Sequence, residues 1–308
     1  MLAWRISISL IIATTGFALH ASGDGTGFVT IDGTNVIPES IAADRRGALY
    51  IGSMAQGTIY RALPRTGRAK VWLDPRSTGI QHAMGVQVDE SNRRLLVCAS
   101  SLDASGVSTG SLRGFDLDSR RAVADYRLEA GGQCNDLAIG DEGTIYATDF
   151  DNGRIMRLLP GDTLLREWVR SPLLAGANGI ALLGTNLYVT SSTSGRLVRI
   201  SPVGKDRTAE VVEISLDGAL AKPDALRVVG ARRLLLVEGA GRLLEIDVSE
   251  PLARLRIVRE GLRDDPAGVA IVGNIAWIVA GRFASLKQPD LNPRPFRAIA
   301  VPYAPESR

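Results

Sequence analysis

The sequence has few of the side chains on which soft-metal sites and nucleophilic triads depend. Its 308 residues include two cysteines, Cys98 and Cys134, and two histidines, His20 and His82. Zinc and copper sites draw mainly on His and Cys. A Ser-His-Asp triad would need His82, since His20 lies in an N-terminal leader described below. The scarcity of both residue types therefore favours chemistry based on oxygen ligands.

The sequence also lacks a strong excess of either charge. It contains 36 basic and 33 acidic side chains, a formal net charge of +3. This balance is too even to predict a nucleic-acid partner or an anionic membrane surface, and we expect the many arginines to lie on solvated rims of the fold. After residue 23 no segment reaches the about 18 apolar residues of a membrane helix. We therefore expect neither a nucleic-acid partner nor a membrane span in that part.

Residues 1–23 differ in composition from the rest of the chain. Arg5 supplies a positive start, residues 6–19 are mostly apolar, and small residues follow up to Gly23. This pattern predicts a secretory signal peptide over 1–23, and a retained membrane anchor is the alternative. The remaining residues, 24–308, would form one domain in the periplasm or outside the cell. In such an oxidising space Cys98 and Cys134 could pair, or could equally be buried free thiols.

The stretch 131–160 provides the unit on which the chain is built. It contains a polar strand start, a short apolar run, and two further strand patterns separated by turns of Asp, Asn and Gly, which is typical of a β-meander. Six strand starts of this kind occur: PESIAAD at Pro38, AMGVQVD at Ala83, CNDLAIG at Cys134, ANGIALL at Ala177, PDALRVV at Pro223 and PAGVAIV at Pro266.

The spacing of these strand starts predicts a β-propeller. Their second residues lie 43 to 51 positions apart: Glu39, Met84, Asn135, Asn178, Asp224 and Ala267. Such a period with about four strands per copy is typical of a propeller blade. We predict an all-β, six-bladed propeller whose ring is closed by an N-terminal strand at 27–32. A β-sandwich would not explain six repeats, and the coils of a β-helix are much shorter.

These second residues would form a ring around the mouth of the central channel. Four of them carry side-chain oxygens: Glu39, Asn135, Asn178 and Asp224. Polar residues at strand starts are often ordinary turn residues, yet four in one structural column predict a cation between them, because converging carboxylates and amides would otherwise lack partners. Oxygen ligands of this kind favour Ca²⁺, while Mg²⁺, Mn²⁺ and Zn²⁺ remain open.

Further candidates surround this mouth. The second strands end at the same rim, so their last residues could support the site or contact a substrate, or could be satisfied turn residues: Ser53, Ser100, Asp149, Ser191 and Glu238. His82 precedes Met84 by two residues on what we expect to be a loop, from which it could face the metal.

The strand starts resemble the metal motifs of the gluconolactonase, regucalcin and luciferin-regenerating enzyme family of six-bladed propellers. The resemblance covers the chain after the leader by repeat order, and it is carried by PES at Glu39, Asn135-Asp136, Asn178-Gly179 and Asp224 after Pro223. It implies that Glu39, Asn178 and Asp224 bind a divalent cation, while Asn135 touches metal or substrate.

The same positions are similar to the calcium ligands of paraoxonase-type lactonases, in which a histidine comparable to His82 acts near the metal. Gluconolactonase-like members often have Arg where this chain has Gln133, and the second histidine of the paraoxonase-type dyad has no counterpart. The resemblance therefore implies lactone hydrolysis as a class.

We accordingly predict a metal-dependent hydrolase of small-molecule lactones or related esters. Asp224 is the first choice as the base that activates water, His82 is the second, and Asn135 would orient the ester. The main alternative is a non-catalytic, calcium-stabilised scaffold that binds a ligand or a protein, because the fold alone does not determine function. A condensing enzyme of the strictosidine-synthase type fits less well, since that chemistry does not require a full metal set.

Overall fold

The computed structural model describes residues 27–102, 108–140, 142–203, 208–288 and 294–304. The predicted signal peptide at 1–23 lies outside the described residues. Within them the protein is almost entirely β-structure. The short helices are α1 (Pro75–Thr78) and the 3₁₀ turns η1 (Pro64–Thr66), η2 (Pro172–Leu174) and η3 (Phe283–Leu286). None of the described helices is long and apolar enough to cross a membrane.

Two sheets contain eight strands each, and both are built from two halves. The first has the order β2 (Pro38–Ala43), β3 (Leu49–Ser53), β4 (Ile59–Ala62), β5 (Arg68–Leu73), β1 (Phe28–Ile31), β25 (Phe296–Pro302), β24 (Ile275–Ala280) and β23 (Pro266–Val272). The second has the order β10 (Cys134–Ile139), β11 (Ile145–Asp149), β12 (Arg154–Leu158), β13 (Leu164–Arg170), β9 (Ala122–Leu128), β8 (Ser108–Asp116), β7 (Arg94–Leu102) and β6 (His82–Asp89). Short parallel contacts, β1 with β5 and β13 with β9, join the halves, whereas all other pairs in these sheets are antiparallel.

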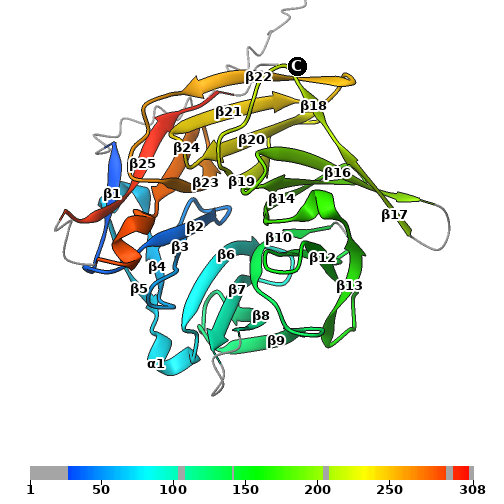
Figure 1. The fold of residues 1–308 in the computed structure, drawn as a ribbon. Coiled ribbons are helices and arrows are strands. Elements are labelled where there is room, and N and C mark those ends of the chain that lie inside the picture. Colours follow the sequence, from blue (N-terminus) through cyan, green and yellow to red (C-terminus); the bar gives the residue numbers. More distant parts are fainter. Residues whose placement is uncertain (1–26, 103–107, 141, 204–207, 289–293, 305–308) are drawn as a thin grey trace, which may run out of the picture.

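Two smaller sheets complete the structure. One contains β14 (Ala177–Leu183), β15 (Asn186–Ser191), β16 (Arg196–Val203) and β17 (Thr208–Glu213). The other contains β18 (Ser215–Leu216), β22 (Leu252–Arg259), β21 (Arg242–Asp247), β20 (Arg233–Glu238) and β19 (Pro223–Val228). Seen along the axis in Figure 1, the sheets are arranged radially, with β2, β6, β10, β14, β19 and β23 nearest the centre.

The turns between strands explain why the chain folds into short meanders. β11 is a run of β-favouring residues, and Gly143 before it and Gly153 after the next turn have φ of +79° and +58°. Only glycine adopts this backbone region freely. The predicted pairing of the N-terminal segment with the last strand is confirmed, because β1 runs antiparallel to β25 from Phe28 opposite Ile299 to Ile31 opposite Phe296.

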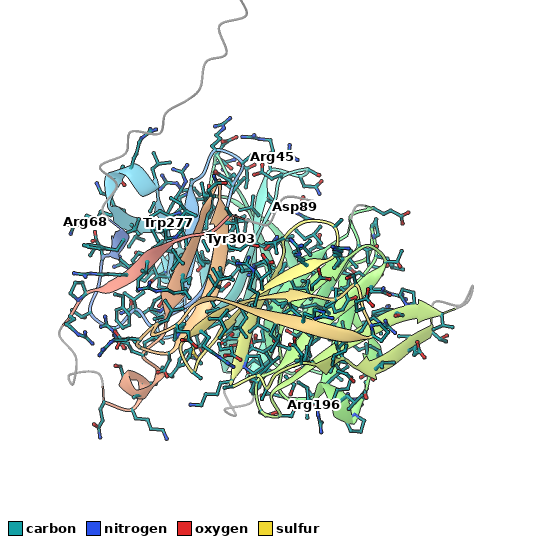
Figure 2. All side chains as sticks on the ribbon, turned by 90° about the horizontal axis from the view of Figure 1, so that it is seen from above. Arg45, Arg68, Asp89, Arg196, Trp277 and Tyr303 are labelled. Atoms are coloured by element: carbon teal, nitrogen blue, oxygen red, sulfur yellow. A yellow bond between two sulfur atoms is a disulfide. The ribbon has the colours of Figure 1, made fainter. Side chains whose placement is uncertain are left out.

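The core consists of apolar side chains packed between neighbouring sheets. The Tyr50 ring meets Trp72 edge to face with centroids 5.1 Å apart, and burying such a side chain stabilises the fold by roughly 2 kcal/mol. The Tyr303 hydroxyl donates to Glu245 at 2.6 Å. Burial and the Glu245 carboxylate raise the pKa of Tyr303, which keeps this donor protonated. In Figure 2, Tyr303 and Trp277 lie between Arg45 and Arg196, which occupy opposite faces of the molecule.

The two cysteines form a disulfide between β7 and β10. Their Cα atoms are 5.1 Å apart, and both side chains are fully buried. The sequence left pairing and free thiols open, and the structure selects pairing. Since Cys134 directly precedes Asn135, the bond attaches one ring residue to the neighbouring blade.

Candidate functional site

The six central strands share a backbone irregularity at the residues of the predicted ring. In each pairing with the next strand, the register shifts at the residue predicted for the ring. This residue is the second of its strand, except in β6, where it is the third: Glu39, Met84, Asn135, Asn178, Asp224 and Ala267. Such β-bulges change the direction of a side chain and occur often beside active sites. The bulge therefore explains how residues at strand starts turn toward the channel instead of joining the sheet packing.

A central cavity of about 670 Å³ brings the predicted metal residues together. Glu39, Asn135, Asn178 and Asp224 all line it, as does Met84. Ala267, the sixth member of the column, is fully buried. The apolar part of the wall consists of Met54, Met84, Phe150, Phe283, Ala284 and Leu286. The cavity thus combines an oxygen-rich floor with apolar sides, a composition typical of small-molecule sites.

Glycines allow the central strands to approach one another closely below this floor. A Cβ at Gly179 would lie 2.2 Å from the Asp224 carbonyl oxygen, and one at Gly85 would lie 2.5 Å from the Asn135 carbonyl oxygen. Backbone atoms cannot yield at such distances, so larger residues would separate the strands. The glycine after Asn178 thus has a packing role beyond turn chemistry.

Two buried threonines fix ring residues from the neighbouring blade. Thr148 at the end of β11 donates its hydroxyl to the Asn178 carbonyl at 2.7 Å, and Thr190 of β15 donates to the Asp224 carbonyl at 2.8 Å. Both threonines are fully buried. This role was not predicted from the sequence, although the signal was present: both threonines lie at the same place in the second strand, in ATD and VTS.

The environment of the carboxylates at the floor disfavours their negatively charged form. Burial raises the pKa of Glu39, and the nearby Asp224 and Asp136 raise it further against the opposing effect of Arg227. Burial likewise raises the pKa of Asp224, again with Asp136 adding and Arg227 opposing. Arg227 donates to Asp136 at 2.9 Å across the channel. One arginine therefore compensates only part of the charge of three carboxylates.

The residues at the floor fit a cation. The buried oxygens without a hydrogen-bond donor in the described part of the chain include Glu39 Oε2 and Asn135 Oδ1 in the cavity, besides Asn35 Oδ1 and Asp136 Oδ1. A bound cation would satisfy the two cavity oxygens. No group of three or more His, Cys, Asp and Glu residues in the described part of the chain is placed to hold a metal. The available set instead mixes two carboxylates with two amides, a combination suited to calcium and not to soft metals.

His82 departs from its predicted surroundings. It is the first residue of strand β6, so the prediction that it lies on a loop is wrong. Its Nδ1 lies 2.7 Å from the Met54 carbonyl oxygen, and it is not among the described residues that line the central cavity. The contact with Met54, which does line the cavity, places His82 behind the wall. Its role as a second base stays a prediction.

The residues at the ends of the second strands serve the turns. Asp149 accepts from Arg154 Nε at 2.7 Å and from the Gln133 backbone at 3.0 Å. Glu238 accepts from the Ala221 backbone and from Arg242. Ser53 and Ser191 donate to backbone carbonyls. For these four, the interpretation as satisfied turn residues is the one the contacts favour.

Other residues at the mouth were not predicted from the sequence. Lys222, Gln133 and Ser192 line the cavity beside the ring. Lys222 has a left-handed backbone conformation with φ of +55° and precedes Pro223. Its position next to the strand start was visible in the sequence, but its direction depends on this conformation. The lysine supplies a positive charge near the rim.

Comparisons with known proteins agree on the architecture. A scan against protein-family models found no match, and neither did a search of curated protein sequences. Among solved structures, a luciferin-regenerating enzyme superposes with a TM-score of 0.63 at 15% identity, with 88% of this chain and 92% of that chain covered. A gluconolactonase from Xanthomonas campestris gives a TM-score of 0.61 at 18% identity, with 85% and 86% covered.

A third similar structure is virginiamycin B lyase from Staphylococcus aureus, solved as a catalytically inactive variant with quinupristin. It superposes with a TM-score of 0.57 at 14% identity, covering 88% of this chain and 98% of that chain. At such low identities these similarities establish the fold and nothing more specific. The chain is an all-β protein with the fold of the gluconolactonase-like β-propellers.

Proposed function

We propose that this protein is a metal-dependent hydrolase of lactones or related cyclic esters, and that its site is the central cavity. The observation that carries the proposal is the convergence of Glu39, Asn135, Asn178 and Asp224 on one cavity, with buried oxygens of Glu39 and Asn135 lacking donors. Calcium is the cation that we propose. The lactonase class is supported by the similarity to a gluconolactonase structure, which by itself concerns only the fold.

The proposal includes a ring of six blades. Each eight-stranded sheet would count as two four-stranded blades, since its halves meet only through a short parallel contact at the edge away from the centre. β18 would be an addition to the outer edge of the blade formed by β19 to β22. The last blade would consist of β23, β24, β25 and the N-terminal β1.

When bound, a divalent cation would polarise the ester carbonyl and stabilise the negative charge that develops on its oxygen. Glu39, Asn135, Asn178 and Asp224 would hold it. Of the two carboxylates, Asp224 is our choice for the base, because its side chain is partly exposed to solvent, whereas that of Glu39 is only 6% exposed. Asp224 would take a proton from water as the water oxygen bonds to the carbonyl carbon. The ring C–O bond then breaks, and the proton passes to the departing oxygen to give a hydroxy acid.

The remaining residues would bind and orient the substrate. Asn135 can donate through its amide nitrogen to the ester, while Phe150, Phe283 and Met84 offer apolar contact to its carbon skeleton. Lys222 at the rim would attract the carboxylate of the product or a polar substituent of the substrate. This division predicts that lactones with an apolar side chain are accepted.

We further propose a periplasmic or secreted location. The buried disulfide between Cys98 and Cys134 supports it, since such bonds persist mainly in oxidising compartments.

The test combines metal removal with a single substitution. The purified protein is treated with chelator and assayed on aliphatic and sugar lactones with and without Ca²⁺, together with Asp224→Asn. We expect turnover only with calcium, and a loss of about 100-fold or more in Asp224→Asn. Glu213→Gln, which removes an exposed carboxylate paired with Arg196 on β16, is the matched control and should retain full activity.

Two outcomes would contradict the proposal. If calcium raises the melting temperature but the unmodified protein turns over no lactone, the site is a structural one and the protein is a calcium-stabilised scaffold. If Asp224→Asn retains both calcium binding and turnover, neither the ligand set nor the base assignment holds.

A further inference from the structure

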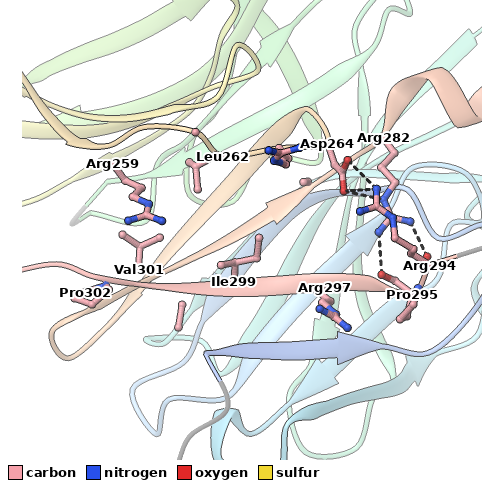
Figure 3. A pocket seen from close by; sticks show the side chains of 14 residues that line it. Arg259, Leu262, Asp264, Arg282, Arg294, Pro295, Arg297, Ile299, Val301 and Pro302 are labelled. Carbon is pink, nitrogen blue, oxygen red and sulfur yellow. Dashed lines mark hydrogen bonds and ion pairs between the residues drawn. The ribbon is translucent and has the colours of Figure 1, made fainter. Parts of the chain in front are cut away.

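A second cavity, of about 520 Å³, lies between the sheet of β19 to β22 and the sheet that contains β24 and β25. It shares no lining residue with the central cavity. Figure 3 shows side chains from the segment after β22 on one side and from β25 on the other. Its charged lining consists of Arg259, Arg263, Arg282, Arg294, Arg297 and Asp264.

The charge of this cavity is strongly unbalanced. Among the residues that the structure describes, Asp264 is the only carboxylate that lines it, and it is shared, since Arg282 Nε and Arg294 Nη2 each lie 3.3 Å from its oxygens. Arg259 and Arg263 have no carboxylate partner among the described residues, and both are exposed toward solvent. In the described lining, guanidinium groups therefore outnumber carboxylates, with Arg259 and Arg263 adding charge beyond the Asp264 cluster, which creates a positive potential in a recess with low-dielectric walls.

Arg282 shows that this arrangement is built into the fold. It is 9% exposed, and its guanidinium donates to the carbonyls of Arg294 at 2.7 Å and Pro295 at 2.9 Å. It also lies over the Phe296 ring at 4.4 Å. Burial lowers the pKa of Arg282, and Arg294 and Arg297 lower it further against the effect of Asp264. The expectation that arginines lie on solvated rims does not fit this residue.

The opposite end of the cavity is formed differently. The guanidinium of Arg259 extends toward Val301 and Pro302 on β25 (Figure 3). Leu262 and Ile299 add further apolar surface between the two charged ends. Arg297 lies over the Phe28 ring at 4.0 Å, which orients its guanidinium. A ligand with a multiply charged oxyanion group and a small carbon skeleton would complement both parts.

We propose that this cavity binds a soluble phosphate monoester. Guanidinium groups form paired, charge-assisted hydrogen bonds to phosphate oxygens. A phosphate monoester carries about −1.5 to −2 charges at pH 7, so it offsets the excess of arginines better than a monocarboxylate does. The apolar wall accommodates the alcohol part of the ester. The site is independent of the proposed hydrolase and does not require the cation.

The test measures phosphate binding by calorimetry at constant ionic strength, using inorganic phosphate, glycerol 3-phosphate and acetate as probes. We expect one equivalent of glycerol 3-phosphate to bind more tightly than acetate. In Arg259→Gln/Arg263→Gln its affinity should fall by about tenfold or more. The matched control is Arg121→Gln/Arg127→Gln, which removes two exposed arginines far from the cavity lining and should change the affinity less than twofold.

Amide hydrogen exchange of the unmodified protein, with and without ligand, locates the binding site without using any variant. Glycerol 3-phosphate should protect residues 259–264 and 294–302. Equal weakening in both double variants would indicate a general charge effect and overturn the proposal, as would the absence of phosphate binding. If the protein binds vesicles of phosphatidylcholine and phosphatidic acid but does not bind glycerol 3-phosphate, the proposal that the ligand is soluble is overturned.

Discussion

The two cavities of this propeller are lined by opposite charges and are formed by different structural devices. The central cavity gathers oxygens from the bulged starts of strands that occupy equivalent places in successive repeats. The arginine cavity gathers guanidinium groups from the end of β22, from two loops and from β25, which have no common place in the repeat. A site that follows the symmetry of a fold is visible in its sequence period, whereas a site formed between two particular blades is not.

The two cavities come nearest in sequence at Asp264 and Asp265. Asp264 lines the arginine cavity and Asp265 lines the central one. Both have left-handed backbone conformations, with φ of +70° and +55°, which cost energy for residues other than glycine. Asp265 accepts from the Phe283 backbone at 3.1 Å, so it fixes the start of η3 at the central cavity. Two consecutive residues of one turn therefore belong to different cavities, Asp264 to the positively charged one and Asp265 to the central one.

The largest expected effect is on calcium binding at the central cavity, with no effect on phosphate binding at the arginine cavity. Glu39→Gln removes a buried carboxylate from the central floor and keeps the shape of the side chain. We expect calcium affinity, measured by calorimetry, to fall by more than the roughly 10- to 100-fold typical of residues that only support a metal ligand. Glycerol 3-phosphate binding should not change. Unaltered calcium affinity would show that Glu39 is not a ligand.

The disulfide offers a second way to distinguish the two cavities. It holds the strand start next to Asn135, which lines the central cavity, and it involves no residue of the arginine cavity. Cys98→Ala/Cys134→Ala opens a loop with a sequence separation of 36 residues. Loop entropy predicts a free energy of unfolding lower by about 3 to 4 kcal/mol, measured by urea denaturation. Calcium affinity should also fall, while glycerol 3-phosphate affinity stays the same once the variant is folded. A loss of phosphate binding alone would contradict this assignment.

The difference between the cavities also explains how far the sequence could be interpreted. The strand starts at Pro38, Cys134, Ala177, Pro223 and Pro266 coincide with the first residues of the central strands, because turn chemistry and apolar runs are local signals. The convergence of the column followed from the repeat. The contact of His82 with the Met54 carbonyl and the pairing of the cysteines depended on packing between blades, on which a period gives no information.

A smaller effect is expected from Thr190, whose hydroxyl fixes the Asp224 carbonyl. Thr190→Val keeps the shape and leaves that buried carbonyl without its donor, so the free energy of unfolding should fall by about 1 to 2 kcal/mol. Calcium affinity should weaken by roughly fivefold, since Asp224 loses a positional restraint. Thr208→Val, at an exposed position on β17, is the matched control. Equal effects in both variants would assign Thr190 to general packing.

The smallest expected effect concerns the charge that the arginine cavity already contains. Asp264→Asn removes its carboxylate, and Asn tolerates the left-handed conformation of this residue. Arg282 keeps its bonds to the carbonyls of Arg294 and Pro295 and its contact with Phe296, so the guanidinium should stay in place. With less competition for the arginines, the affinity for glycerol 3-phosphate should rise by roughly two- to fivefold, whereas calcium affinity at the central cavity should not change. A weaker affinity would instead show that Asp264 is needed to position the arginines. In that case its role in holding the guanidinium groups would outweigh its repulsion of the phosphate.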